Sequence, residues 1–116
     1  MKRLIFALWL IAAAGPAAAQ EVLPVPWARE QPNPSDFRNT YPVGALAEGV
    51  SGDVRLLCTI TDEYKLDCAV HSETPAGYGF GDAALRLSRL YVASPDDPRI
   101  AVGGRVLLPI RYEMRD

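Results

Sequence analysis

The 116-residue chain has few of the residues that metal and redox sites need, with one histidine and two cysteines. So few strong ligands exclude a multi-ligand zinc site and most metal catalysis. A net charge of −2, from 12 basic and 14 acidic side chains, excludes an overall basic nucleic-acid binder. The glycines at 77, 79 and 81 lack the spacing of a dinucleotide site. We therefore expect no cofactor, no bound metal and no small-molecule substrate.

A catalytic constellation is also missing from the sequence. His71 is flanked by Ser72 and Glu73, but adjacent strand residues point to opposite faces, so these side chains do not converge as a triad requires. The acidic pairs at 62–63 and 96–97 fall in expected turns and lack the spacing of an EF-hand. The sequence predicts that the protein is not an enzyme.

Long apolar runs are absent as well. A spanning helix needs about 20 apolar residues, whereas the run Leu4–Ala14 has 11 and ends at Gly15-Pro16. Two basic residues precede it, and Ala17–Ala19 supplies the small residues of a cleavage site. Residues 1–19 are predicted to be a secretory signal peptide, cleaved near Ala19-Gln20, which places the protein in an oxidising compartment. The alternative is an uncleaved membrane anchor.

Prolines gather in one stretch, residues 20–40, at positions 24, 26, 32 and 34. Proline lacks the backbone donor that helix and sheet interiors need, so this stretch is predicted to be an extended, proline-rich linker. Trp27 and Phe37 stand out within it. We interpret both as docked against the folded domain or exposed, with a partner-binding motif as the alternative.

Residues 41–116 carry the periodic patterns of a folded domain. A short helical turn is expected after Tyr41-Pro42, closed by Gly49. Apolar residues then alternate along 54–60 and again along 65–70, which is the period of half-buried strands. A polar turn separates the two segments, so they are predicted to form a hairpin.

The hairpin brings the two cysteines together. If Ile60 faces Leu66 across the turn, Cys58 faces Cys68. Opposed residues of an antiparallel pair have Cβ atoms about 4.5–5.5 Å apart, and export supplies an oxidising compartment. The sequence therefore predicts a disulfide between Cys58 and Cys68.

One helix and one strand complete the domain. Apolar residues from Phe80 to Tyr91 form a single helical stripe. The last segment places alternate residues on one face, at positions 106, 108, 110, 112 and 114. The order short helix-β-β-α-β predicts a two-layer α+β domain, with one main helix on one face of a three-stranded antiparallel sheet. Pro109 has no N–H to donate, so the last strand is expected at an edge.

Several short motifs, in this order, resemble the C-terminal domain of the TonB energy-transducer family. The resemblance covers residues 41–114, and its motifs are Tyr41-Pro42, Ala45-Leu46, Gly49–Val54, Gly79–Arg86 and Val106–Tyr112. It implies a TonB C-terminal-like domain over 41–116, working in the periplasm with TonB-dependent outer-membrane transporters. Family members capture a short transporter peptide, the TonB box, as an extra strand beside their last strand.

The resemblance also assigns residues to this capture. The implied peptide-receiving edge consists of Arg105, Val106, Leu107, Leu108, Pro109, Ile110, Arg111 and Tyr112. Tyr41 and Pro42 match a motif that precedes the hairpin and are further partner-binding candidates. Such strand addition makes physical sense, because an edge strand presents unpaired backbone groups and makes little demand on side-chain identity.

The chain departs from full transducers in its N-terminus. They have a spanning helix and a long proline-rich linker, whereas this chain has a predicted cleaved signal and a short linker. We therefore expect an exported, soluble interaction module that binds a peptide segment of an envelope protein. The alternatives are a membrane-anchored minimal energy transducer with an uncleaved N-terminus, and a structural subunit that self-associates, for example as a strand-exchanged homodimer.

Overall fold

The computed structural model describes residue 20 and residues 22–114. The predicted signal peptide, residues 1–19, lies outside the described residues. The elements in chain order are β1 (Ala28–Glu30), α2 (Pro34–Thr40), α3 (Val43–Glu48), β2 (Gly52–Ile60), β3 (Leu66–Thr74), α4 (Phe80–Ser88), β4 (Val92–Ala93) and β5 (Arg105–Tyr112).

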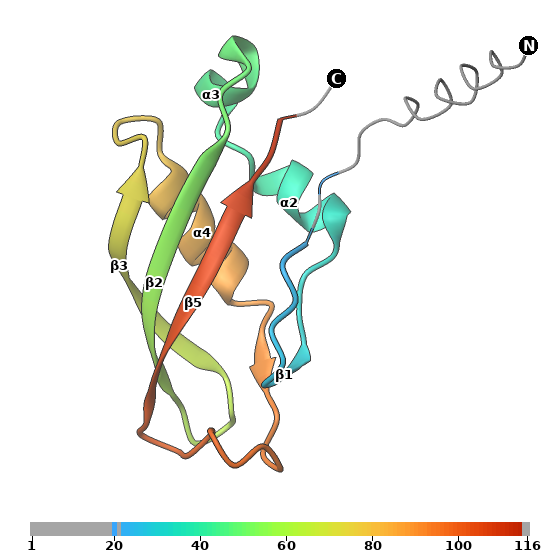
Figure 1. Cartoon of the computed structure of the whole chain (residues 1–116), viewed down its shortest axis with the longest axis vertical. Coiled ribbons are helices and arrows are strands. Elements are labelled where there is room, and N and C mark those ends of the chain that lie inside the picture. The colour runs from blue at the N-terminus through green and yellow to red at the C-terminus, as the bar shows by residue number, and fades with distance from the viewer. Residues whose placement is uncertain (1–19, 21, 115–116) are drawn as a thin grey trace, which may run out of the picture.

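The main sheet has three antiparallel strands in the order β3-β2-β5. Helix α4 packs against β3 and β2 on one face, behind the sheet in the view of Figure 1. A second, two-stranded sheet joins β1 to β4 beside it. The predicted α+β class and the three-stranded antiparallel sheet covered by a helix are thus confirmed.

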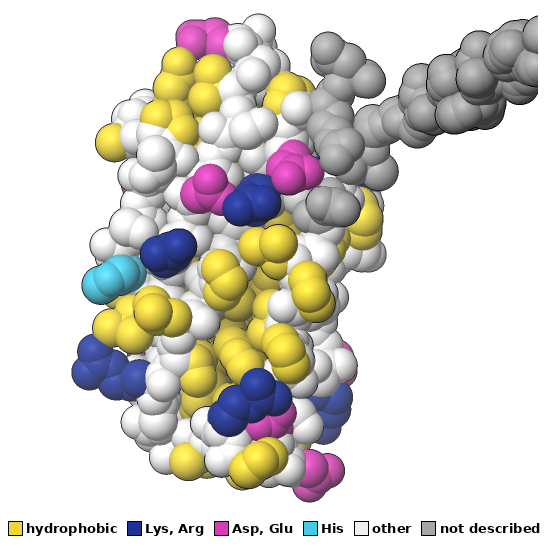
Figure 2. Space-filling model, viewed as in Figure 1, with side chains coloured by type: hydrophobic (Ala, Val, Ile, Leu, Met, Phe, Trp, Pro, Cys, Tyr) yellow, Lys and Arg dark blue, Asp and Glu magenta, His cyan; other side chains and the backbone are white. Residues whose placement is uncertain are grey.

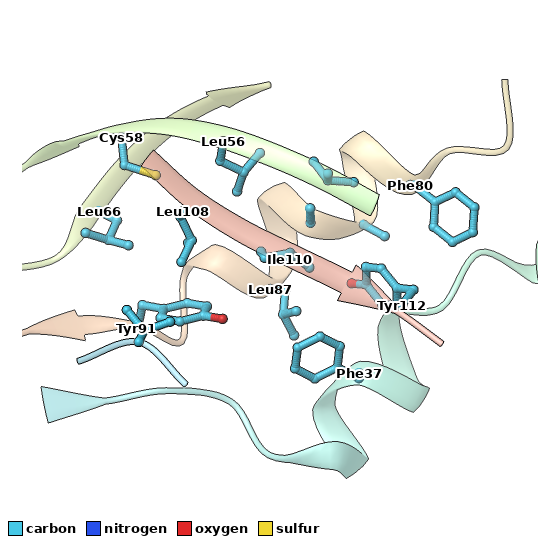
Figure 3. Packing of buried hydrophobic residues seen from close by; sticks show 14 of the residues in the cluster. Phe37, Leu56, Cys58, Leu66, Phe80, Leu87, Tyr91, Leu108, Ile110 and Tyr112 are labelled. Atoms are coloured by element: carbon cyan, nitrogen blue, oxygen red, sulfur yellow. The ribbon is translucent and has the colours of Figure 1, made fainter. Parts of the chain in front are cut away.

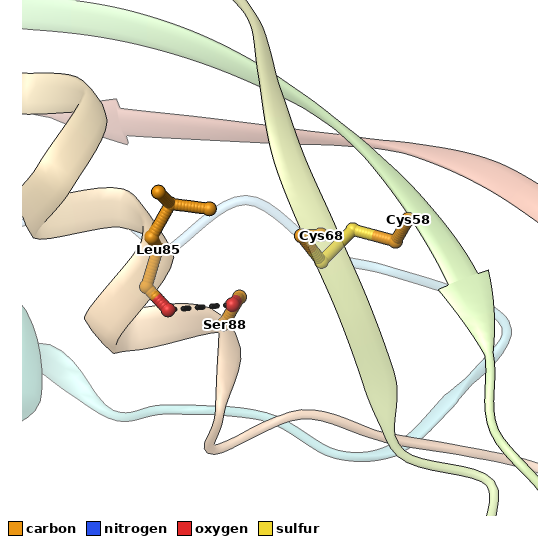
Figure 4. The surroundings of a disulfide bond; sticks show 4 residues. All are labelled: Cys58, Cys68, Leu85 and Ser88. Atoms are coloured by element: carbon orange, nitrogen blue, oxygen red, sulfur yellow. Dashed lines mark hydrogen bonds between the residues drawn. A yellow bond between two sulfur atoms is a disulfide. The ribbon is translucent and has the colours of Figure 1, made fainter.

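The register of the hairpin is the predicted one. Cys58 pairs with Cys68 and Ile60 with Leu66, and a disulfide joins Cys58 to Cys68. The two cysteines form the closer, non-hydrogen-bonded kind of antiparallel pair, and their Cα atoms are 3.9 Å apart. The disulfide lies beside α4, near Leu85 and Ser88 (Figure 4). The cross-link opposes a one-residue slip, which would turn every core side chain of the strand to the other face.

The core lies between the sheet and the helices, and Figure 3 shows side chains of β2, β5, α4 and α2 converging there. Tyr112 is at the centre of its aromatic part. Its ring centroid lies 5.3 Å from that of Tyr41, 5.4 Å from that of Phe37 and 5.7 Å from that of Phe80. Aromatic pairs at such distances contribute about 0.5–1.5 kcal/mol each beyond their buried area. These contacts hold the end of β5 against α2 and α4.

Residues 20–40 depart from the extended linker that we expected. Helix α2 begins with a capping box, in which the Asn33 side chain accepts from the Asp36 N–H (3.0 Å) and the Asp36 carboxylate accepts from the Asn33 N–H (2.9 Å). Pro34 occupies the first turn, where its missing N–H costs no helical hydrogen bond. Trp27 and Phe37 are both buried, so they dock against the domain, which is one of the two placements we considered.

Two further boundaries differ from expectation, and one turn residue has an unusual backbone conformation. Helix α4 ends at Ser88, although Tyr91 beyond it remains buried. Strand β3 continues to Thr74, past the apolar alternation that ends at Val70, because a bulge after Val70 restores pairing at Ser72. Tyr64, in the turn between β2 and β3, has a positive φ of 63°, a conformation that favours glycine.

The close approach of Gly52 to Phe80 generates a stability prediction. A Cβ at Gly52 would lie 2.5 Å from ring atoms of the buried Phe80, so we expect Gly52→Ala to lower the free energy of unfolding by about 1–3 kcal/mol. Urea unfolding measures this change. The matched control is Gly44→Ala, where no atom lies within 4 Å of the added Cβ, and helix propensity should raise stability by up to about 1 kcal/mol. Equal stability of the two variants would contradict the packing described for Phe80.

Buried tyrosines generate a second prediction, for alkaline pH. Burial raises the pKa of Tyr112 from its ordinary 10.0 to about 12, and burial also raises that of Tyr91. A raised pKa in the folded state means that stability is fully present below pH 10 and is lost as pH rises toward about 12. We expect Tyr112→Phe to flatten this loss, measured as the free energy of unfolding against pH. Loss of the hydroxyl's contact with Thr40 lowers stability at every pH, so the slope is the test.

Candidate functional site

Strand β5 is an edge strand, as the sequence predicted. Among the described strands it pairs only with β2. The Ile60 N–H donates to Gly104 O (2.8 Å) and Ile60 O accepts from the Gly103 N–H (2.8 Å). The N–H and C=O groups of successive residues point to opposite sides of a strand. The backbone groups of the even-numbered residues of β5 therefore point toward β2, and those of the odd-numbered residues point toward the open side.

This alternation explains how β5 tolerates a proline. Pro109 is odd-numbered, so its missing N–H would have faced the open side and no hydrogen bond to β2 is lost. Of the described residues, none forms a hydrogen bond with the outward N–H of Leu107 or the outward carbonyl of Pro109. These groups are the open part of the edge.

The same alternation divides the eight residues of the predicted peptide-receiving edge. Leu108, Ile110 and Tyr112 are buried and Val106 is half-buried, so these side chains belong to the core. The other four side chains lie on the sheet face away from α4, and they are those of Arg105, Leu107, Pro109 and Arg111. Only these four side chains are available to a partner.

Tyr41 and Pro42 have structural roles. Tyr41 is buried, its hydroxyl donates to Val50 O (2.6 Å), and its ring packs edge-on against Phe80. Burial raises the pKa of the Tyr41 hydroxyl. Pro42 is the N-cap residue that directly precedes α3. The Tyr41 side chain is therefore not presented to a partner in this conformation.

The N-terminal segment reaches the open side of β5, a contact that sequence reasoning missed. The Gln20 Nε2 donates to Arg111 O (2.8 Å), and the Gln20 Oε1 accepts from the Glu113 N–H (3.0 Å). A side-chain amide offers a donor and an acceptor, as a peptide group does, so Gln20 meets this edge much as a neighbouring strand would. Residues from 22 onward continue past β5 toward β1 (Figure 1). No local sequence signal predicts a contact between residues 91 positions apart.

A groove lies where this segment passes the sheet. Its volume is about 370 Å³, and its walls come from β2, β3, β5 and Leu23. A second hollow of about 390 Å³ adjoins it at the end of β5. Asp53 and Arg111 line both, and the Arg111 Nε donates to the Asp53 Oδ1 (2.9 Å). This ion pair forms the boundary between the two hollows.

Next to the groove, the exposed sheet face is apolar. Leu57 on β2 pairs with Leu107 on β5 and with Ala69 on β3. The Leu107 side chain is 51% exposed. Figure 2 shows apolar side chains gathered over the middle of this face, with charged side chains around them. The edge of β5 thus borders an apolar surface on one side and the groove at one end.

Within residue 20 and residues 22–114, no three His, Cys, Asp or Glu side chains cluster closely enough to hold a metal ion. The same residues contain no helix that is long and apolar enough to cross a membrane.

Comparisons with known proteins were made for the whole chain. No family model matches it, and a search of curated proteins finds no match. The resemblance to TonB C-terminal domains therefore stays a prediction, and the function has to be argued from the geometry of β5 and its surroundings.

The Gln20 contact generates a prediction about the edge. Because the Glu113 N–H is hydrogen-bonded to Gln20 Oε1, we expect Gln20→Ala to speed hydrogen exchange of the Glu113 amide by up to about tenfold, the equivalent of one net hydrogen bond. Amide exchange followed by NMR measures this. The Met114 amide, which donates to Ser51 Oγ (2.8 Å), is the internal control and should not change. Unchanged exchange at Glu113 would mean that Gln20 does not protect this edge in solution.

Proposed function

We propose that this protein is an exported interaction module that binds an extended peptide segment of an envelope protein as an additional strand on β5. It acts in the periplasm, after cleavage of residues 1–19, and a TonB-dependent outer-membrane transporter is the partner class that the sequence resemblance favours. It works by binding and not by catalysis.

The observation that carries this proposal is the open backbone of β5. The outward groups of Leu107 and Pro109 have no hydrogen-bond partner among the described residues. An exposed edge of this kind pairs readily with another extended chain. Main-chain hydrogen bonds then supply affinity, and alternate side chains supply specificity.

The contact made by Gln20 supports the same mode of binding. Its amide engages Arg111 and Glu113 in a peptide-like way, so the outward backbone groups at this end of β5 are placed to bond a peptide group. A partner strand that extends beyond Pro109 toward Glu113 must displace Gln20. A shorter one, beside Arg105 to Pro109, leaves Gln20 in place.

Strand β3 offers a second open edge. It pairs only with β2 in the described part of the main sheet. The Thr61 N–H donates to Lys65 O, so the N–H and C=O groups of odd-numbered residues join β2 to β3 in this part of the hairpin. Before the bulge, the backbone groups of the even-numbered residues of β3 therefore point outward. This edge supports the alternative of self-association, and it also supplies a matched control.

The test uses synthetic peptides that carry the TonB boxes of transporters encoded in the same genome. Titration into the ¹⁵N-labelled full chain should protect the Leu107 amide from exchange. Leu107→Pro removes the outward donor without removing a bond to β2, so we expect it to weaken peptide binding about tenfold.

The control variant is Val70→Pro, which removes an outward donor from the other edge. It should leave the affinity unchanged, provided that its amide spectrum shows the native fold. Peptides that protect Val70 instead of Leu107 would place the partner on β3. Peptides that protect neither amide would exclude strand addition for this class of partner.

A further inference from the structure

Arg55 has an unusual position on the exposed sheet face. It lies in β2, with Ser72 beside it on β3 and Pro109 beside it on β5. Among the described residues, no carboxylate forms an ion pair with Arg55. Arg111, in contrast, pairs with Asp53 at 2.9 Å and approaches Glu113 at 3.9 Å.

The groove that contains Arg55 has an excess of positive charge. Its lining includes two guanidinium groups, those of Arg55 and Arg111, and one carboxylate, that of Asp53. Asp53 is already paired with Arg111. The Arg55 guanidinium is therefore left without a counter-charge among the described residues of the groove, and Ser72 and Thr74 on β3 line the same groove.

The groove reaches the edge at which a partner strand would lie, because Pro109, Ile110 and Arg111 of β5 line it. Leu23 lines it from the N-terminal segment, which runs beside β5 (Figure 1). Pro109 is the β5 partner of Arg55, and both residues line this groove. Strands lie about 4.8 Å apart, so a strand added to β5 lies two spacings, about 10 Å, from β2, and an acidic side chain on it is within reach of the long Arg55 side chain.

From these observations we propose that the groove is a subsite for a carboxylate side chain. An acidic residue of the strand that adds to β5 replaces Leu23 and pairs with Arg55. A planar guanidinium matches a carboxylate with two parallel hydrogen bonds. This inference rests on the proposed strand addition. It adds that the partner is an extended acidic segment that competes with the chain's own N-terminal residues.

The test uses the full chain and its own segment as the probe. Leu23→Glu, Leu23→Gln and Leu23→Lys are made in the native background and in Arg55→Glu. At low salt, we expect the folding equilibrium constant of Leu23→Glu to exceed that of Leu23→Lys about two- to fivefold, the range of an exposed ion pair. In the Arg55→Glu background the order should reverse. The uncharged Leu23→Gln variant should lie between them in both backgrounds, and high salt should compress the differences.

The Glu113 amide reports whether the segment stays on the edge in each variant, through its hydrogen bond to Gln20. Detachment in Leu23→Glu but not in Leu23→Lys would overturn the subsite, because the groove would then reject a carboxylate. Equal stability of the Glu and Lys variants in both backgrounds would also overturn it.

The peptide titration separates this inference from the proposed function. Peptides with an acidic residue facing Pro109 should bind more tightly than lysine analogues, and Arg55→Glu should invert that preference. Peptides that protect the Leu107 amide equally, whatever their charge, would overturn the subsite and leave strand addition intact. Failure of every peptide to protect the Leu107 amide would instead contradict strand addition at β5. The Leu23 and Arg55 variants would then still test whether the groove binds a carboxylate.

Discussion

The packing around Tyr112 holds the sheet, α4 and α2 together at the end of β5. Its ring contacts aromatic side chains that lie before β2 and at the start of α4, and its hydroxyl lies 2.7 Å from Thr40 Oγ1 at the end of α2. Because Tyr112 is the last residue of β5, these contacts fix that strand from its inner face. The opposite side of the strand is then free to meet other chains without loss of core packing. A rigid inner face is what allows an edge to act as a binding surface.

Much of the domain follows from local patterns in the sequence. Alternating apolar residues are enough to predict the hairpin, and pairing Ile60 with Leu66 is enough to predict the disulfide. Pro109 is enough to place β5 at an edge, because few other positions in a sheet tolerate the missing donor. These features share a cause, since each depends on a strand's two-residue period or on a single residue's backbone chemistry.

The features that escaped prediction depend on longer-range or competing effects. Prolines between 24 and 34 suggested an extended chain, yet Pro34 starts a helix because Asn33 and Asp36 cap it. The bulge in β3 extends pairing past a break in the alternation. Gln20 contacts β5, and Leu23 lines the same groove as Arg55, although these residues are far apart in the chain. No local pattern in a single sequence predicts such contacts. The outer half of the candidate site was therefore invisible until the fold was known.

Pro109 has a consequence for how any second strand aligns with this edge. A chain that pairs with β5 meets both a donor and an acceptor at Leu107, but only an acceptor at Pro109. Sliding the chain along by two residues keeps its side chains on the same faces, yet it changes which of its carbonyls meets the gap. Because only Pro109 lacks an outward N–H, different registers of an added strand leave a different carbonyl without a donor, and the registers therefore differ in energy. Pro109 also interrupts the repeating pattern that would let identical edges stack without limit, which is how exposed strands lead to fibrous aggregates.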